Sequence, residues 1–561
     1  MQRILELVDD VGAIDTSGLA LVLERASFIF LALMVAAAPH SIAATQTAWL
    51  IGMAAWVARQ FVARGSYRRD QPNSRARQFL NYALWALLIW SAISSLMSYE
   101  PAISLDRLRG VSVLLIFFFV VGCVRTRRAA IFLGLLLIYS CMVNVVWTPI
   151  ERVLGRGVEI HGVSPDGPLG KALLYSGDTL LEVNRQKVSS PEEVVAALEL
   201  SDVSEVKFYR PDFDAVVKVK KGDVLAGDSA TAQLGIDGWS KSHNWRSKGF
   251  YGHYTTYAEV LQLIASLLFG LVIASISKRR GGEEQRSEGA GSTETAARAR
   301  SLSSTPPLLP SSIPRLLTSS TLLIISLAAM CFALLLTVTR ASQLAFMISA
   351  FVIVILGASR KMAMAAVLLA LPIAFGGLLF LQQSRNTGFF DSRDESTRYR
   401  FVMWRDGVRI WSESPRNIVF GVGMDSIQKR WQEWGMYEGG SLPMGHFHST
   451  LVQLLVERGL PALLIWLIAL AAYIWILLVA IRRMRSNAPP DRDARLTFGM
   501  LLGCLGGAIG FFASGIVHYN LGDQEVAMVF YLLMGLGVRL ACETVRRPNT
   551  VEKRVEYRLA A

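Results

Sequence analysis

The stretch RGLPALLIWLIALAAYIWILLVA, residues 458–480, contains no charged side chain after Arg458. A helix of about 20 apolar residues crosses the hydrocarbon core of a bilayer, so this stretch predicts a transmembrane helix. Similar runs recur from one end of the chain to the other, and we expect about twelve spans in all. They lie near residues 18–38, 43–63, 79–98, 107–124, 129–148, 257–277, 316–337, 341–358, 362–381, 458–480, 497–515 and 525–541.

The composition agrees with a membrane protein. Of the 561 residues, 52% are hydrophobic and 18% are charged, and the mean hydropathy is +0.38. This balance excludes an ordinary water-soluble enzyme. A net charge of +13 would suggest a nucleic-acid partner in a soluble domain. Here Lys and Arg gather at the ends of apolar runs, where they set orientation, so we expect no nucleic acid.

Basic residues fall on every second connection between the expected spans, and one such cluster is Arg482, Arg483 and Arg485. Because short cytoplasmic loops carry an excess of Lys and Arg, we assign this side to the cytoplasm. The pattern predicts a multipass protein of the bacterial cytoplasmic membrane with both termini in the cytoplasm. The two long segments 149–256 and 382–457 then lie in the periplasm, where function should be sought.

The expected fold is an all-α polytopic membrane protein with an inserted α+β module and a second long periplasmic loop. A polar stretch rich in Gly, Ser and Pro predicts a flexible linker on the cytoplasmic side. The expected regions are the first transmembrane helices at 1–148, the module at 149–225, a connector with the sixth span at 226–280, the linker at 281–314, a transmembrane core at 315–545 that includes the periplasmic loop 382–457, and a cytoplasmic tail at 546–561.

The inserted module alternates short β-branched runs with turn signals, and Ser190 before Pro191 predicts the start of a helix. The stretch SPDGPLGKALLYSGDTLLEVNRQKV (164–188) followed by PEEVVAALE (191–199) resembles a bacterial periplasmic PDZ domain. Such domains bind peptide ends by adding a strand to a sheet edge, which implies a periplasmic protein or peptide as partner. The candidate loop is Gly155-Arg156-Gly157-Val158, and a spacer without a peptide ligand is the alternative.

Four short motifs lie on the same expected side of the membrane. His448 and Ser449 precede Gly459 at the mouth of the tenth span. The other three are Thr337-Val338-Thr339-Arg340-Ala341-Ser342 between the seventh and eighth spans, Arg400 with Trp404 and a downstream Gly421-Val422-Gly423, and Arg246-Ser247-Lys248-Gly249 before the sixth span.

In this order and topology the four motifs resemble those of the O-antigen ligase and polysaccharide polymerase superfamily. The resemblance covers nearly the whole chain except the inserted module. It implies metal-independent, inverting transfer of a glycan from undecaprenyl diphosphate to an acceptor hydroxyl on the periplasmic face, without a cofactor. If the acceptor is lipid A-core, the enzyme is an O-antigen ligase. If it is another lipid-linked glycan, the enzyme is a polymerase of O-antigen or exopolysaccharide, and the motifs do not separate the two.

The residue types suit that chemistry. An imidazole takes up a proton near neutral pH, so His448 is the expected general base, with His446 as the near alternative. Guanidinium groups donate paired hydrogen bonds to phosphate oxygens, so Arg340, Arg400 and Arg246 are the expected ligands of the diphosphate. We expect these side chains to converge around one water-exposed pocket, without a metal ion.

A transporter or a membrane scaffold that recruits a partner through the PDZ-like module is the alternative from another class. It predicts broken spans with polar residues in mid-membrane. The central residues of the expected spans are almost all apolar, which favours the enzyme.

Overall fold

The computed structural model describes residues 18–62, 75–210, 213–288, 316–359, 395–442, 445–487 and 491–545, with a few single positions between 361 and 368. The chain divides into two compact units. The small unit comprises Val143–Gly249 and Leu335–Val338, and the helical unit comprises Met1–Met142, Phe250–Leu334 and Thr339–Ala561.

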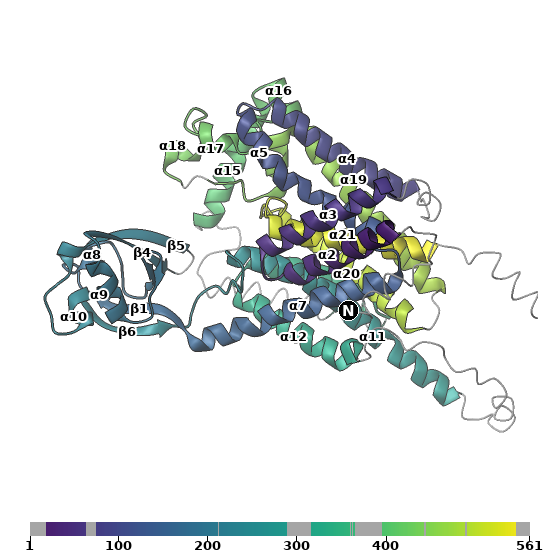
Figure 1. Cartoon of the computed structure of the whole chain (residues 1–561), viewed down its shortest axis with the longest axis horizontal. Helices are drawn as coiled ribbons and strands as arrows, with labels where there is room; N and C mark the ends of the chain where they lie inside the picture. The colour runs from purple at the N-terminus through teal and green to yellow at the C-terminus, as the bar shows by residue number, and fades with distance from the viewer. Residues whose placement is uncertain are drawn as a thin grey trace, which may run out of the picture. The chain divides into compact units, whose positions relative to one another are not determined.

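The helical unit consists mainly of long apolar helices (Figure 1). Its first half contains α2 (Gly18–Ala37), α3 (Ile42–Val62), α4 (Arg75–Leu96), α5 (Pro101–Val111), η1 (Ser112–Leu114), α6 (Leu115–Cys123) and the start of α7 (Arg127–Leu154). Its second half contains α11 (Tyr254–Glu288), η4 (Leu316–Thr318), α12 (Ser320–Leu336), α13 (Arg340–Gly357), α15 (Glu395–Ser412), α16 (Pro415–Phe420), α17 (Ser426–Arg430), α18 (Tyr437–Gly440), α19 (Thr450–Asn487), α20 (Arg492–Gly515) and α21 (Gln524–Val545).

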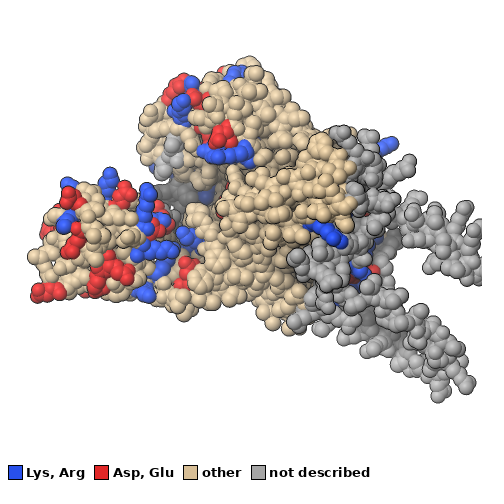
Figure 2. All heavy atoms as spheres, viewed as in Figure 1, with Lys and Arg blue, Asp and Glu red and all other residues tan. Residues whose placement is uncertain are grey.

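Eight of the described helices are long and apolar enough to cross a membrane, which agrees with a polytopic membrane protein. The expected number of about twelve is not reached within the described residues. Helix α12, with 17 residues, is shorter than these eight helices. The expected ninth span near 362–381 falls almost wholly outside the described residues. On the face of the helical unit drawn in Figure 2, a broad surface shows very few Lys, Arg, Asp or Glu side chains, as a lipid-facing surface requires.

The expected span 107–124 differs from the structure. A separate helix, α5, ends at Val111, and a single 3-10 turn leads from it into α6. Arg107 in α5 forms an ion pair with Asp425, and Arg109 pairs with Asp106. The ion pair of Arg107 holds α5 to the segment that carries Asp425, and the Arg109–Asp106 pair lies within α5, so the apolar run begins later than the sequence suggests.

Three helices of the helical unit pack against one another in a clear register. Helix α11 contacts α20 along its length, and α13 contacts both. The Ser349 hydroxyl donates to the Gly506 carbonyl at 2.7 Å, and Ala345 lies against Gly510. Residue numbers decrease along α13 as they increase along α20, so the two helices are antiparallel. The start of α13 therefore lies beside the end of α20.

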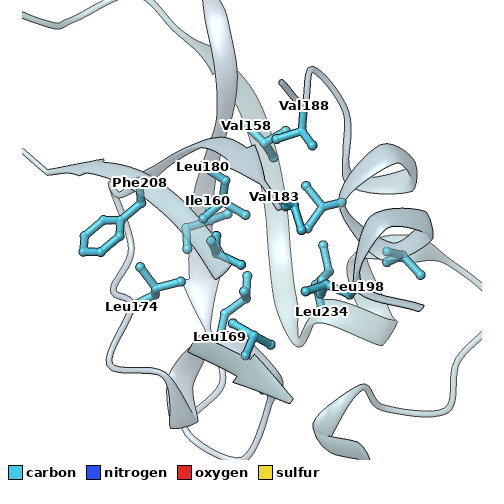
Figure 3. Packing of buried hydrophobic residues seen from close by; sticks show 14 of the residues in the cluster. Val158, Ile160, Leu169, Leu174, Leu180, Val183, Val188, Leu198, Phe208 and Leu234 are labelled. Atoms are coloured by element: carbon cyan, nitrogen blue, oxygen red, sulfur yellow. The ribbon is translucent and has the colours of Figure 1, made fainter. Parts of the chain in front are cut away.

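The small unit contains an antiparallel sheet with strand order β5-β4-β2-β1-β6, and β3 pairs with β2. The N-cap predicted at Ser190 is confirmed, since its side chain accepts from the Glu193 amide. The core of this unit is drawn in Figure 3, where Ile160, Leu180 and Val183 of the sheet meet Leu198 and Leu234 of the helices. Its elements are β1 (Arg156–Val163), α8 (Pro168–Lys171), β2 (Thr179–Val183), β3 (Gln186–Lys187), α9 (Pro191–Glu199), β4 (Val203–Arg210), β5 (Phe213–Lys220), η2 (Lys221–Asp223), α10 (Ala230–Leu234) and β6 (Ile236–Ser242).

Two boundaries lie beyond those expected from the sequence. The sheet of the small unit continues through β6 to Ser242, past residue 225. Helix α11 continues to Glu288, past residue 280, where the linker was expected to begin. The rest of the expected linker and the expected tail lie outside the described residues.

Candidate functional site

The segment 445–449 before α19 is fixed in place by Phe447. This ring is 1% exposed and packs against Gly407 of α15. Both backbone groups of Phe447 are bonded, because its amide donates to Gln453 Oε1 at 2.9 Å and its carbonyl accepts from Trp404 Nε1 at 2.7 Å. Anchoring this one residue fixes its two neighbours, His446 and His448, whose rings lie 4.3 Å apart between centroids.

His448 has a left-handed backbone, with φ at +47°. For a residue with a Cβ this conformation costs on the order of 1–3 kcal/mol and persists only where the surroundings hold it. Phe447 holds it from one side, and Ser449 holds it from the other by accepting from the Val452 amide at the start of α19. Strain of this kind gathers at functional sites, which supports a specific role for the His448 side chain.

The next residue, Thr450, joins the start of α19 to the segment after α20. Its amide donates to the His518 carbonyl at 3.0 Å, and its hydroxyl lies 2.8 Å from Asn520 Oδ1. Asn520 in turn donates to the Phe511 carbonyl at 2.7 Å, near the end of α20. The His-Ser motif and the end of α20 therefore form one bonded assembly.

The glycine of the motif allows a sharp bend. Gly459 has φ 77° and ψ 173°, a conformation open essentially to glycine alone, and it separates the short helical segment 450–458 from the long apolar helix that follows. A Cβ at Gly459 would lie 2.0 Å from the Val419 carbonyl oxygen, and one at Gly421 would lie 2.4 Å from the Glu457 carbonyl carbon. Gly459 and Gly421 are both needed at this contact, because the backbone after α16 lies directly against the backbone at the kink of α19.

Backbone hydrogen bonds complete this contact. The amides of Val422 and Gly423 donate to the carbonyls of Val456 and Glu457, each at 2.9 Å. The segment between α16 and α17 therefore pairs with the start of α19 over two consecutive residues. This pairing fixes the position of the His-Ser motif relative to the helix that carries Arg400.

Arg400 and His448 are brought together. Tyr399, the neighbour of Arg400 in α15, has its ring 5.8 Å from that of His448. The pKa of His448 is lowered to about 3, chiefly because the imidazole is buried and to a smaller extent because of its electrostatic interactions with His446, Arg400, His518 and His253. The pKa of His446 is also lowered, again first by desolvation. His448 is therefore a neutral imidazole at neutral pH.

Arg340 lies at the same end of the helical unit as His448. It is the first residue of α13, and its side chain is half-buried. The register of α13 against α20 places this end beside the segment 516–520, to which the start of α19 is bonded. The beginning of a helix adds a partial positive charge from its free amides, which favours an anion there.

Arg246 belongs to the small unit. It is half-buried and follows Trp245, whose ring is 1% exposed. The next residue, Ser247, donates its amide to the Leu336 carbonyl at 3.0 Å. Of the four expected site residues, His448, Arg400 and Arg340 lie in the helical unit, and Arg246 lies in the other.

One pair of ionisable residues at this end was missed by sequence reasoning. His518, after α20, lies with its Nδ1 2.8 Å from Oε1 of Glu259 in α11. The side chain of Glu259 is 3% exposed and that of His518 is 12% exposed. These residues are far apart in the chain and belong to no motif that the sequence displays, so only the fold reveals their pairing.

Comparison with known families supports the prediction made from the four sequence motifs. Residues 325–467 match the family described as O-Antigen ligase. The chain carries an O-antigen ligase domain. No curated protein matches the chain at a significant level.

The O-antigen ligase domain contains Arg340, Arg400, His446 and His448. The match at residues 325–467, together with the eight candidate spans among the described residues, indicates a multipass protein of the inner membrane and an enzyme of the ligase or polymerase type that acts on lipid-linked glycans. Arg246, Glu259 and His518 lie outside the matched segment.

Outside the O-antigen ligase domain, the expected peptide-binding loop Gly155–Val158 is not a loop: from Arg156 on it belongs to β1, and this strand is covered on both sides. β1 pairs with β2 along one edge and with β6 along the other, where Glu159 faces Ser240 and Val163 faces Ile236. A peptide can add a strand only to an unpaired edge. In this structure, a ligand at the Gly155–Val158 loop would have to displace β6 before it could pair with β1.

Proposed function

We propose that the protein transfers a glycan from undecaprenyl diphosphate to an acceptor hydroxyl at the periplasmic face of the inner membrane, with lipid A-core as the acceptor. The observation that carries the proposal is the surroundings of His448: the ring of Tyr399, next to Arg400 in α15, lies 5.8 Å from the His448 ring, and the charge of Arg400 contributes to the lowered pKa of His448. A neutral imidazole and a permanent cation are the two groups that this transfer needs side by side.

The arginines bind the diphosphate of the donor in this proposal. Arg400 and Arg340 offer charge-assisted hydrogen bonds to phosphate oxygens, and the start of α13 offers free amides. As the bond to the anomeric carbon breaks, negative charge grows on the departing diphosphate, and fixed cations stabilise it most at that moment. Arg246 lies in the small unit and stays a third candidate ligand on its sequence motif alone.

His448 acts as the general base on the acceptor hydroxyl. Its lowered pKa keeps a lone pair available at neutral pH. The same cations that lower this pKa are neutralised when the diphosphate binds, so the imidazole becomes a better proton acceptor once the donor is in place. His446 is the alternative base, two residues upstream and in ring contact with His448.

The test is a transfer assay with purified protein in proteoliposomes and a labelled undecaprenyl diphosphate glycan. We expect His448→Ala to lower the rate roughly 100-fold to 10,000-fold, the range that general base catalysis supplies. His161→Ala, a half-buried residue of β1 in the small unit, is the control and should leave the rate unchanged. Wild-type turnover by a folded His448→Ala protein would refute the site.

A second pair of variants tests the diphosphate ligand. Arg400→Gln should raise the KM for the donor about tenfold or more, because a hydrogen bond to a charged group contributes about 1.5–3 kcal/mol. Arg405→Gln removes a 68% exposed arginine from the same helix and is expected to have little effect. Equal KM values for the two variants would argue against Arg400 as a ligand.

The choice of acceptor decides between ligase and polymerase. Donor glycan supplied with lipid A-core should yield glycosylated lipid A-core. Elongated lipid-linked glycan formed from the donor alone would instead identify a polymerase of O-antigen or exopolysaccharide. Binding of a labelled substrate without any covalent product would favour a transporter or scaffold.

A further inference from the structure

The last three turns of α7 belong to the small unit and expose an apolar stripe. Its side chains recur at spacings of three and four residues, so they lie on one face of the helix. At the end of the stripe Val153 is 79% exposed and Leu154 is 59% exposed. A contiguous exposed apolar surface marks a contact with a partner or with lipid. The stripe consists of Val143, Val146, Trp147, Ile150, Val153 and Leu154.

The length of α7 places its end at the outer surface of the hydrocarbon core. The helix has 28 residues and begins at Arg127, in a basic cluster that the sequence assigns to the cytoplasm. Because about 20 helical residues cross a hydrocarbon core of about 30 Å, the last residues of α7 reach the headgroup layer on the other side. Arg152, and Arg156 at the start of β1, then lie at the depth of the lipid phosphates.

Three basic side chains gather beside this end of α7. The Cζ atom of Arg156 lies 4.5 Å from the ring centroid of Trp245 and 5.1 Å from that of Tyr209. Arg152 donates from Nη2 to the carbonyl of the same Trp245. The charge of Lys248, three residues further on, interacts with that of Arg156. The segment around Trp245 therefore brings the three cations together within the small unit.

These cations are not neutralised by ion pairs. Within the described part of the chain, Arg152, Arg156 and Lys248 form no ion pair, whereas Arg210 of the same unit pairs with Asp178 at 2.6 Å. The Nε atoms of Arg152 and Arg156 are buried, and neither has a hydrogen-bond partner among the described residues. Buried donors are normally satisfied, so an acceptor from outside the chain is expected here.

Two carboxylates, those of Glu151 and Asp214, face this cluster without balancing its charge. Arg156 and Lys248 each interact electrostatically with both of them. Burial lowers the pKa of Arg156 and of Lys248, so the charged form of each gains from an additional anion beside it. On the face of the small unit drawn in Figure 2, Lys and Arg side chains gather near one end. The positive members around Glu151 are Arg152, Arg156, Lys187 and Lys248.

We propose that the junction of α7 and β1 is a binding site for an anionic phospholipid of the outer leaflet. Arg156, Arg152 and Lys248 hold its phosphate, and the stripe of α7 packs against an acyl chain. Guanidinium groups donate paired hydrogen bonds to phosphate oxygens, and the ammonium group adds a further charge. A zwitterionic lipid brings its own ammonium group, which these cations repel, so an anionic headgroup is preferred. The inference does not depend on the transfer reaction.

The test is photocrosslinking of a lipid probe to the purified full chain in detergent. The probe is phosphatidylglycerol with a photoreactive diazirine beside its phosphate, and mass spectrometry locates the modified residues. We expect labels in 147–156 and in 245–248. Unlabelled phosphatidylglycerol should remove these labels at a concentration roughly tenfold lower than phosphatidylethanolamine does, because attraction of an anionic headgroup adds up over several cations.

Two glutamine variants test the phosphate ligands. Arg156→Gln and Lys248→Gln should each lower the amount of label roughly tenfold, because each removes a charge-assisted hydrogen bond. Arg156→Lys keeps the charge but loses the planar fork, so its label should fall between Arg156→Gln and the wild type. Lys220→Gln is the matched control. Lys220 is an exposed lysine of β5, about 20 Å along the strand from Asp214, and its loss should leave the label unchanged.

The variants must keep the small unit folded. Hydrogen exchange in β2 and α9 should match the wild type in each of them, since these elements carry the core of the unit. Arg156 also packs against two aromatic rings, so Lys248→Gln supplies a measurement that does not depend on this packing.

Three outcomes would overturn the proposal. Equal competition by phosphatidylglycerol and phosphatidylethanolamine would show contact with lipid in general and no headgroup site. Wild-type labelling of both Arg156→Gln and Lys248→Gln in a folded small unit would show that these cations do not hold the phosphate. Competition by an undecaprenyl diphosphate glycan at a lower concentration than by phosphatidylglycerol would assign the cations to the glycan donor.

Discussion

Two features of His448 are energetically unfavourable and are not expected of a residue with only a structural role. Its backbone lies in the left-handed region, and its imidazole is half-buried among groups that disfavour its charged form. Phe447, Ser449 and Thr450 supply the contacts that hold it there. A side chain held at this cost in a neutral form is suited to accept a proton.

The lowered pKa of His448 predicts unusual chemical reactivity at acid pH. Diethyl pyrocarbonate acylates only neutral imidazole, and at pH 5.5 a histidine with the ordinary pKa of about 6.5 is mostly protonated. With a pKa of about 3, His448 stays neutral and should be modified at pH 5.5 nearly as fast as at pH 7.5. Mass spectrometry of the peptide that contains residue 448 measures this.

The neighbouring His446 needs its own control, because its pKa is lowered as well. The measurement is therefore made in a His446→Ala protein. Modification of residue 448 that is rapid at pH 7.5 and nearly absent at pH 5.5 would show an ordinary imidazole and would contradict the electrostatic environment described here.

At the scale of single elements, the bend at Gly459 is the most demanding feature. Gly459→Ala places a Cβ 2.0 Å from the Val419 carbonyl oxygen and forces alanine into a region open essentially to glycine. We expect a loss of stability of about 1–3 kcal/mol or more, seen as a lower midpoint of thermal unfolding by tryptophan fluorescence. Gly222→Ala, where a Cβ meets nothing within 4 Å, is the control. Equal midpoints for the two variants would mean that the bend is not as tight as described.

The small unit permits a separate prediction about β6. If β6 covers the edge of β1, it protects the amides of Glu159 and His161 from hydrogen exchange, whereas the Ile160 amide between them donates to the Asp178 carbonyl on the other side of β1. Ser240→Pro removes an amide from β6 and disfavours pairing, so exchange in β1 should become faster in the full chain while β4 and β5 stay protected. Unchanged exchange in β1, measured by mass spectrometry, would show that β6 does not cover this edge.

The sequence predicted some elements well and others poorly, for physical reasons. Long apolar runs between polar breaks predicted helices such as α2, α4, α20 and α21, because each run must satisfy its backbone within the bilayer. The span at 107–124 was misplaced because Arg107 finds its partner, Asp425, far away in the chain.

The candidate site was predictable only where a motif marks it. His448, Arg400 and Arg340 belong to short patterns that can be recognised in one sequence, and the domain match covers them. His518 and Glu259 belong to no pattern, and their contact depends on the antiparallel packing of α11 against α20. The strand β6 was missed for a similar reason, since its short sequence acquires an edge to pair with only after β1 has formed.

At the scale of the whole helical unit, the two ends of the helices differ in chemistry. At one end Glu24 pairs with Arg59 at 2.9 Å and with Arg125 at 2.7 Å, so basic residues there are neutralised by a buried acid. The end of α13 away from Arg340 accepts a hydrogen bond from Arg485, which identifies the opposite end of that helix. His446, His448 and Arg400 lie near the start of α19. Arg485 lies near the other end of the same helix.

The most direct test of the site is to map where the donor diphosphate binds. An undecaprenyl diphosphate analogue with a photoreactive diazirine beside the diphosphate would be crosslinked to the full chain in proteoliposomes, and the modified peptides identified by mass spectrometry. We expect labels in 398–404, 445–453 and 340–345, reduced by competing unlabelled donor. Competable labels confined to the opposite ends of these helices, around Leu356 and Arg485, would contradict a site built on His448 and Arg400.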